Sequence, residues 1–199
     1  MPKSDVAPTA DAAVAVANNI GYPVVAKIAS PDILHKSDIG AVKVGLTKAA
    51  DVRDAYDLIE FRSRRSNPNA DIWGVLVQQM IQGGKEVIIG MSRDPQFGPM
   101  LMFGLGGIYV ESLRDVTFRI TPFDRREARE MIGEIKAASI LRGTRGEGPS
   151  DVEALADALL RLSQLVIDFP EIVEFDVNPL TVFEDGRGLV GIDMRLVLE

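Results

Sequence analysis

Oxygen-bearing side chains alternate along one apolar segment near the end of the chain. Glu174, Asp176 and Asn178 occupy every second position there, and they share one face of a predicted strand because successive strand residues point to opposite faces. Asp193 lies in the next predicted strand, beyond a hairpin-like turn at 184–188, where it can face the same site. Carboxylate and amide oxygens are the ligands that Mg²⁺ requires, with nucleotide phosphates completing its shell. The pattern therefore favours a metal site; the alternative is an acidic face in contact with solvent.

Two nitrogen-bearing side chains early in the chain are candidates for phosphate chemistry. Lys27 lies within a short apolar run at 23–28 that is typical of a buried strand. Because an unpaired buried ammonium group is costly, Lys27 must reach either an anion such as phosphate or solvent at the strand edge. His35 is the only histidine and lies in a polar loop at 30–38. Imidazole suits proton or phosphoryl relay near neutral pH, whereas most lone surface histidines carry no function, so the residues alone leave both alternatives open.

A glycine-rich segment, FGLGGI at 103–108, follows another predicted strand. The backbone N–H groups of Gly104, Gly106 and Gly107 are candidates to cradle an anion. The segment lacks the Gly-Lys-Ser/Thr ending of a Walker A loop, and it does not complete the dinucleotide-binding spacing. As a bare pattern it is equally compatible with a plain turn.

Composition places the chain among ordinary globular proteins. Its 199 residues are 46% hydrophobic and 26% charged, which suits one large domain or two small lobes. The absence of cysteine excludes disulfides and thiolate metal sites and is compatible with a reducing cytosol. A net charge of −7 argues against nucleic acid as the main partner. No apolar run approaches the roughly 18–20 residues of a membrane helix, and no signal peptide is evident, so we expect a cytoplasmic protein without a membrane partner.

Hydrophobic periodicity predicts an α+β architecture. Helices are predicted over 9–20, over 51–65, around 128–135, and from a capping box at 150–153 onward. Strands are predicted over 23–28, 40–46, 72–79, 86–92, 100–103, 171–177, 180–183 and 189–194. The glycine pair at 83–84 predicts a hinge near 79–84. We therefore expect two lobes, 1–82 and 83–199.

Seven ordered segments together resemble the ATP-grasp domain of the ADP-forming (nucleoside-diphosphate-forming) acetyl-CoA synthetases, relatives of succinyl-CoA synthetase. They are YPVVAK at 22–27, SPDILHKSD at 30–38, VLVQQM at 75–80, KEVIIG at 85–90, RDPQFGP at 93–99, FGLGG at 103–107 and DVNP at 176–179. The resemblance covers nearly the whole chain. It implies a two-lobed ATP-grasp fold with the nucleotide in a cleft between two sheet-and-helix lobes.

The same resemblance implies a nucleotide site with ATP or ADP and Mg²⁺ as cofactors. Lys27 resembles the lysine that contacts the nucleotide phosphates, and Glu86 resembles the acidic residue on the ribose side. Asn178 and Asp193 resemble the pair that ligates Mg²⁺. Adenine is expected against a hinge strand, and the glycine-rich segment is expected beside the nucleotide. The hinge-strand residues are Gln78, Gln79, Met80 and Ile81. The residues of the glycine-rich segment are Gly104, Gly106 and Gly107.

The resemblance also implies an acid–CoA ligase reaction, acyl-CoA + phosphate + ADP ⇌ carboxylate + CoA + ATP, through an acyl phosphate and a phosphohistidine. Asp176 resembles the acidic residue that faces the incoming phosphohistidine, and His35 resembles a histidine thought to relay phosphate. Nothing here resembles the CoA-binding part, so a CoA-binding alpha subunit, or fused alpha-type domains, is the expected partner.

Two other functions remain as alternatives at this level. One is a non-catalytic, nucleotide-sensing module of a protein acetyltransferase, because Ala41 replaces the second glycine of a usual pair and the chain starts late relative to the family. Retention of His35, Asp176, Asn178 and Asp193 argues for chemistry instead. The other is a different ATP-grasp ligase, such as a carboxylase or peptide ligase, which fits poorly.

Overall fold

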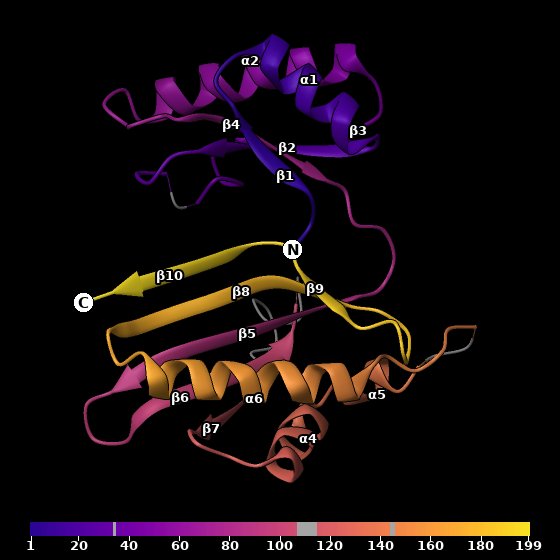
Figure 1. Ribbon diagram of the computed structural model, residues 1–199, viewed down its shortest axis with the longest axis vertical. Helices are drawn as coiled ribbons and strands as arrows, with labels where there is room; N and C mark the ends of the chain where they lie inside the picture. Colours follow the sequence, from indigo (N-terminus) through magenta and orange to yellow (C-terminus); the bar gives the residue numbers. More distant parts are fainter. Residues whose placement is uncertain (34, 107–114, 144–145) are drawn as a thin grey trace. The chain divides into compact units, whose positions relative to one another are not determined.

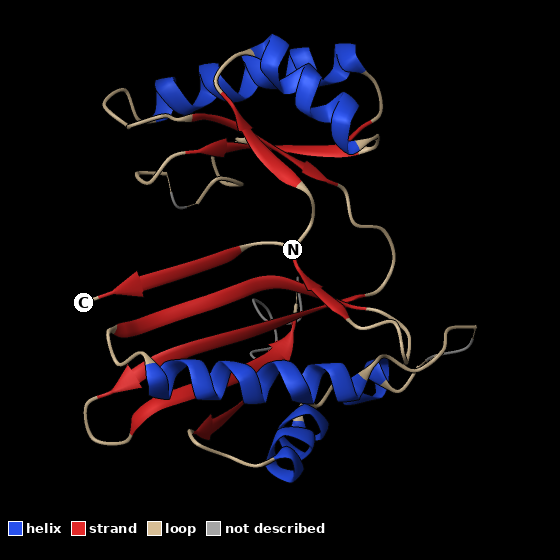
Figure 2. Cartoon of the chain, in the orientation of Figure 1, coloured by secondary structure: helices blue, strands red, loops and turns tan. Residues whose placement is uncertain are grey.

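The computed structural model describes residues 1–33, 35–106, 115–143 and 146–199 (Figure 1). The chain divides into two compact units, Pro2–Gln82 and Gly83–Glu199, the second together with Met1. Each unit combines one sheet with its own helices, as Figure 2 shows, and each has its own hydrophobic core. The expected α+β class is confirmed. No helix within the described ranges is long and apolar enough to cross a membrane.

The first unit is a sheet whose described strands are all antiparallel, in the spatial order β1-β4-β2-β3. Two helices, α1 and α2, pack on one face of it (Figure 1). The elements are β1 (Ser4–Ala7), α1 (Ala10–Ile20), β2 (Val24–Ala29), β3 (Val42–Leu46), α2 (Ala49–Ser66) and β4 (Gly74–Gln79). Strand β1 is too short and too polar to have been predicted from its sequence pattern.

The helices of this unit follow their predicted signals. Thr9 is the N-cap of α1, because its hydroxyl accepts a hydrogen bond from the N–H of Ala12 at 3.2 Å. Gly21 ends α1 with a φ of 93°, which a residue with a side chain rarely adopts. The predicted apolar stripe of α2 is buried against the sheet: Val52, Ala55, Tyr56 and Ile59.

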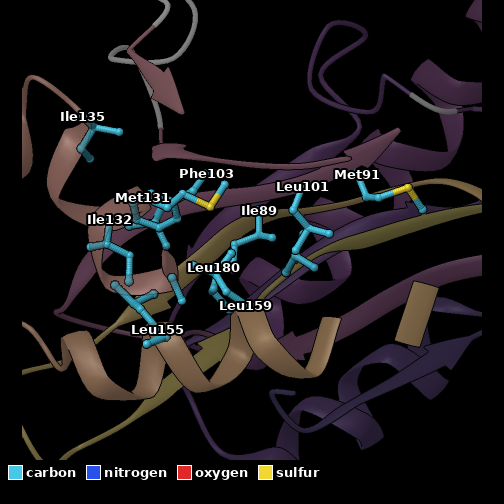
Figure 3. Close-up of a cluster of buried hydrophobic side chains, with 14 of the residues drawn as sticks. Ile89, Met91, Leu101, Phe103, Met131, Ile132, Ile135, Leu155, Leu159 and Leu180 are labelled. Atoms are coloured by element: carbon cyan, nitrogen blue, oxygen red, sulfur yellow. The ribbon is translucent and has the colours of Figure 1, made fainter. Parts of the chain in front are cut away.

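The second unit is a larger antiparallel sheet with the spatial order β10-β8-β5-β6-β7, in which β9 also pairs with β8. Helices α4 and α6 pack on one of its faces, and Figure 3 shows Leu159 of α6 near Leu180 and Ile89 of the sheet, with Leu155 near Ile132 of α4. The elements are β5 (Lys85–Asp94), β6 (Gly98–Leu105), β7 (Val116–Ile120), α4 (Arg125–Glu134), α5 (Ala138–Leu141), α6 (Val152–Asp168), β8 (Ile172–Val182), β9 (Leu189–Gly191) and β10 (Met194–Leu198).

Strand β8 departs from the prediction, because it continues through Asn178 and Pro179 instead of ending there. Its partner also differs: the predicted strand at 189–194 is divided into β9 and β10. Pairing nevertheless continues between them, since the N–H of Ile192 donates to the carbonyl oxygen of Pro179 at 2.9 Å. Strands β9 and β10 therefore form one antiparallel hairpin with β8, and the predicted turn at 184–188 connects β8 with β9.

The predicted capping box at 150–153 is wrong by one residue. Ser150 instead forms an isolated bridge with Glu184, and Asp151 is the N-cap of α6, accepting from the N–H of Ala154 at 2.9 Å. A capping box does occur at the start of α4, where Asp124 and Glu127 exchange hydrogen bonds.

Candidate functional site

The acidic residues of β8 lie on the sheet face opposite to α4 and α6. Phe175 and Val177 are buried in the core with these helices, so the intervening Glu174, Asp176 and Asn178 point to the other side. We call this side, marked by those three residues, the helix-free face, because none of the helices described for this unit packs on it. Alternation along β8 thus separates a packing face from a polar face, as the sequence pattern predicts.

Asn178 and Asp193 are brought together by the hairpin. The N–H of Asn178 donates to the carbonyl oxygen of Asp193 at 3.1 Å, and the neighbouring pair Val177 and Met194 lies directly opposite in the ladder. Residues opposite each other in an antiparallel pair direct their side chains to the same face. The carboxylate of Asp193 and the amide of Asn178 therefore lie side by side on the helix-free face.

A β-bulge sets the direction of Asn178. Between the pairs Val87–Leu180 and Ile89–Val177, strand β8 contains one residue more than β5. The alternation of β8 shifts at this point, because Val177 and Leu180 are both in the core. Bulges re-aim side chains and occur often beside functional sites. Here the bulge exposes Asn178 while both of its flanks remain packed.

This pair of residues fits Mg²⁺ in the manner usual for nucleotide sites. Outside the gaps at 34, 107–114 and 144–145, no cluster of three or more His, Cys, Asp or Glu side chains is arranged to hold a metal. Mg²⁺ is commonly held by one or two side-chain oxygens, with waters and substrate phosphates completing its octahedron. Asp193 and Asn178 supply two hard oxygen donors, which matches that incomplete shell.

Asp176 lies on the same face between β5 and β10, opposite Gly90 and Arg195. Burial raises the pKa of Asp176 above its ordinary value; Arg195 opposes this shift, while Glu174 and Asp193 add to it. Nη1 of Arg195 lies 3.2 Å from Oε1 of Glu174 and 3.9 Å from Oδ1 of Asp176. Three carboxylates and one guanidinium are thus clustered on this face.

In the first unit, Lys27 and Gln78 share the sheet face opposite to its helices. Lys27 pairs with Leu76, and Val25 pairs with Gln78, so the two polar side chains are diagonal neighbours across β2 and β4. Lys27 is 5% exposed and Gln78 is 3% exposed. Because β2 lies between β4 and β3, the alternative of a lysine reaching solvent at a strand edge is excluded.

The segment expected to meet adenine follows Gln78 at the end of β4. The N–H of Gln79 donates to the carbonyl oxygen of Lys3 at 2.8 Å, and that of Met80 donates to Pro23 at 3.2 Å. Ile81 lies beyond the strand and is half-buried. The backbone is therefore fixed as far as Met80, and the adenine contact of these residues stays a prediction.

Glu86 and the predicted glycine cradle belong to the second unit. Glu86 is exposed on β5, and its carbonyl oxygen accepts from the N–H of Gly106 at 2.8 Å. The N–H of Gly106 is therefore already used and does not serve an anion. A Cβ on Gly104 would lie 2.9 Å from the carbonyl oxygen of Asp115, so strand packing explains this glycine. Gly107 lies outside the described residues.

His35 lies in the loop between β2 and β3 and is exposed. The loop is fixed on both sides of it: Asp32 accepts from the N–H of Asp71 at 2.7 Å, and Arg62 donates to the carbonyl oxygen of Gly40 at 3.2 Å. Among the described residues, His35 itself makes no hydrogen bond. His35 is thus an exposed residue of a loop that is held at Asp32 and at Gly40.

The structure adds information on two positions, Arg195 and Ala41. Arg195 was not predicted, although its position two residues after Asp193 in a strand places it on the same face. Ala41, the departure from the family pattern, is fully buried, and its methyl group packs in the core of the first unit.

Comparison with known proteins defines the class. Residues 1–198 match the family described as ATP-grasp domain. The chain is 54% identical over 193 residues to acetate–CoA ligase (ADP-forming) I of Archaeoglobus fulgidus, covering 97% of this chain and 28% of that protein. It is 48% identical over 198 residues to the beta subunit of acetate–CoA ligase (ADP-forming) I of Pyrococcus furiosus, covering 100% of this chain and 84% of that subunit.

Solved structures give the same result. A dinucleotide forming acetyl-coenzyme A synthetase 1 from Ca. Korarchaeum cryptofilum, in complex with coenzyme A, Ca-AMPCP and HgCl+, superposes with a TM-score of 0.95 at 45% identity, covering 100% of this chain and 86% of that one. A second structure of that protein contains coenzyme A and Mg-AMPPCP, with its phosphohistidine segment pointing towards the nucleotide binding site; the TM-score is 0.84 at 41% identity, with 100% and 85% covered.

The chain therefore belongs to the ATP-grasp domain family. Within this family it is of the type found in ADP-forming acetate–CoA ligases and their beta subunits, which confirms the resemblance stated from the sequence. It spans 28% of the length of the Archaeoglobus ligase.

Proposed function

We propose that this chain is the nucleotide-binding and phosphoryl-transfer part of an acid–CoA ligase that converts ATP to ADP. The whole enzyme would interconvert carboxylate, CoA and ATP with acyl-CoA, ADP and phosphate. The proposal is supported by the relatives and, in this chain, by one observation: Asn178 and Asp193 are paired beside Asp176 on the helix-free face. A domain with only a packing role has no use for that set of oxygens.

The proposed nucleotide contacts follow from the resemblance. Lys27 would neutralise phosphate charge, for which a buried ammonium held on an interior strand is well suited. Gln78 and the segment after it would meet the base, and Glu86 would accept hydrogen bonds from the ribose hydroxyls. Each role follows from the resemblance and is compatible with the position described for that residue.

Asn178 and Asp193 would hold Mg²⁺ together with the nucleotide phosphates. When bound, the ion would neutralise charge on the phosphates and orient them for transfer. The hairpin already brings the two donors together through the backbone, so binding requires little rearrangement of this chain.

Asp176 and His35 would act on the phosphoryl group. In the direction of ATP synthesis, the N–P bond of the incoming phosphohistidine would break while a new N–P bond forms to His35, and the proton that His35 loses would pass to the released imidazole. The N–P bond on His35 would then break, a P–O bond would form to the terminal oxygen of ADP, and His35 would take up a proton. Asp176 would accept a hydrogen bond from the imidazole of the incoming phosphohistidine and orient its ring. His35 would serve as an intermediate acceptor on the way to the nucleotide.

The CoA and acyl sites would be supplied by a CoA-binding alpha subunit or by fused domains. The beta-subunit name of the Pyrococcus relative and the coenzyme A in the Korarchaeum structures support this partner.

Calorimetric titration of the purified chain tests the proposed function. We expect saturable binding of ATP and ADP that is strengthened by Mg²⁺, with one site per chain. Absence of binding for both nucleotides, with and without Mg²⁺, would refute the proposal.

A further inference from the structure

The helix-free face of the second sheet has an unusual charge arrangement for a site that must receive phosphate. Three carboxylates, Glu174, Asp176 and Asp193, lie on it. Like charges repel, so an approaching phosphoryl dianion would be disfavoured unless a positive group compensates. In the proposed function Lys27 and Mg²⁺ already supply positive charge, and Asp193 would hold the ion. The question is therefore which side chain of this sheet compensates Glu174 and Asp176.

Arg195 is the only lysine or arginine that the described strands of this sheet direct to the helix-free face. The other lysine and arginine side chains of these strands lie on the face that packs against α4 and α6. Arg93 donates to the carbonyl oxygen of Val166 in α6 at 2.9 Å, and Arg119 pairs with Glu134 of α4. Lys85 lies two residues before the core residue Val87 on β5, so it points to the same face, and it forms an ion pair with Glu147. Arg195 therefore has a distinct position.

The geometry of Arg195 leaves part of its guanidinium available. It lies directly opposite Asp176 in the β8–β10 ladder, and its side chain is 46% exposed. Both of its ion pairs, to Glu174 at 3.2 Å and to Asp176 at 3.9 Å, use Nη1. In the part of the chain that the structure describes, Nε and Nη2 make no hydrogen bond or ion pair. Glu174 thus contacts Nη1 of the guanidinium, while Nε and Nη2, which form the other edge of the group, remain available to a ligand.

We propose that Arg195 binds a phosphoryl group at the helix-free face, with Nε and Nη2 donating to two of its oxygens. This inference rests on the proposed function and adds a residue to it. The parallel N–H groups of a guanidinium match two phosphate oxygens, which an ammonium does not reproduce. Glu174 then acts as the positioning residue, because its contact with Nη1 fixes the plane of the fork.

The same phosphoryl chemistry can come from two sources, the terminal phosphate of the nucleotide or a phosphohistidine. A first experiment addresses the nucleotide. In the 199-residue chain, Arg195→Gln should weaken MgATP binding by about tenfold while changing MgADP binding less than about twofold. Arg195→Lys should recover only part of the loss. A selective loss of MgATP binding would indicate that the Arg195 guanidinium binds the terminal phosphate of the nucleotide.

A second experiment addresses the phosphohistidine. The chain is incubated with free phosphohistidine and MgADP, and ATP formation is followed. If Arg195→Gln binds both nucleotides normally but forms ATP about tenfold more slowly, the fork serves the phosphohistidine. Unchanged nucleotide binding together with unchanged ATP formation overturns the proposal.

Arg119→Gln is the matched control, because it removes one strand arginine and its ion pair with glutamate on the opposite side of the same sheet. It should leave both measurements unchanged. Equal weakening of ATP, ADP and adenosine in Arg195→Gln, with a lower melting temperature, would show a structural ion pair and overturn the proposal. Failure of the wild type to bind any nucleotide would instead refute the proposed function itself.

Discussion

The carboxylate of Asp151 accepts a hydrogen bond from the N–H of Gly188 at 2.9 Å. Its other oxygen caps α6 by accepting from the N–H of Ala154. One side chain therefore joins the first turn of the helix to the hairpin that connects β8 with β9. Because that hairpin sets the pairing of Asn178 with Asp193, Asp151 supports the candidate metal site from the opposite end of the hairpin.

Asp151→Ala should destabilise the fold through the loss of both hydrogen bonds. Loss of an N-cap costs about 1 kcal/mol, and a second bond to a charged acceptor adds a similar amount, so we expect about 2 kcal/mol. Thermal unfolding measures it, at roughly 2–4 °C per kcal/mol for a chain of this size. Asp124→Ala, which removes only the cap of α4, is the control and should cost about half as much.

The stabilisation by Asp151 should also depend on pH. Backbone N–H groups, first of Ala154 and then of Gly188, hold the pKa of Asp151 below its ordinary value of 3.8. A carboxyl group whose pKa is lower in the folded state contributes stability above the unfolded value, and loses it as the pH falls through the folded value. The advantage of wild type over Asp151→Asn should therefore be full near neutral pH and shrink below pH 3.8. Denaturant titrations at several pH values test this, and a constant difference would contradict it.

Asp193→Ala should uncouple nucleotide binding from Mg²⁺. The substitution keeps the backbone carbonyl that pairs with Asn178, so the hairpin should remain intact. We expect MgATP affinity to fall by about tenfold or more, and metal-free ATP affinity to change by less than about twofold. Calorimetric titrations in the presence and absence of Mg²⁺ give both values.

Asp185→Ala is the control for that experiment, because it removes an exposed carboxylate from the turn of the same hairpin. It should bind MgATP as wild type does. Equal losses with and without Mg²⁺ in Asp193→Ala would indicate a structural role for this residue.

Much of this site was predictable because short-range rules determine it. Alternation along β8 places Asp176 and Asn178 on one face, and the turn at 184–188 returns the chain so that Asp193 meets Asn178. The stripe of α2 and the cap of α1 likewise depend on residues close in sequence. Local periodicity and turn chemistry carry enough information for such features.

Other features depend on long-range pairing that the sequence does not reveal. The bulge at Asn178 exists only relative to the register of β5, so the prediction ended β8 there. Ser150 is drawn into a bridge with Glu184, far away in sequence, and this leaves Asp151 as the cap. Arg195 was missed for a different reason: the predicted strand ended at 194, one residue before it, whereas β10 continues to Leu198.

Lys27→Met should weaken binding in proportion to the phosphate charge of the ligand. Methionine keeps much of the apolar stem, so the fold should be retained while the cation is lost. We expect ATP affinity to fall by about tenfold or more and adenosine affinity to remain unchanged. Calorimetry with both ligands measures the contrast, and Lys27→Arg should not restore it fully.

Lys43→Met provides the matched control for Lys27. Lys43 lies on the neighbouring strand β3 and pairs with Ala26, so it belongs to the opposite face of the same sheet. The Lys43→Met variant loses the same charge as Lys27→Met and should bind ATP as wild type does. A folded Lys27→Met protein with wild-type ATP affinity would contradict the phosphate assignment.

His35→Asn should block phosphoryl relay without weakening nucleotide binding. The imidazole is exposed on a loop that Asp32 and Arg62 anchor, so it is accessible to an incoming phosphoryl group while its backbone stays in place. A neutral imidazole is a competent nucleophile, and dividing one long transfer into two would suit sites that lie too far apart for direct displacement. We expect wild type, supplied with its CoA-binding partner and labelled ATP, to carry acid-labile phosphate.

The variant should lose this label and most of the overall turnover, with ATP affinity within about twofold of wild type. Asp38→Asn, in the same loop, is the control and should retain the label. The competing explanation is that His35 only donates a hydrogen bond to a phosphate oxygen during binding. That explanation requires weaker nucleotide binding in His35→Asn and no label on wild type. Measuring affinity, label and turnover on the same preparations therefore separates a relay, which affects transfer alone, from a contact, which affects binding first.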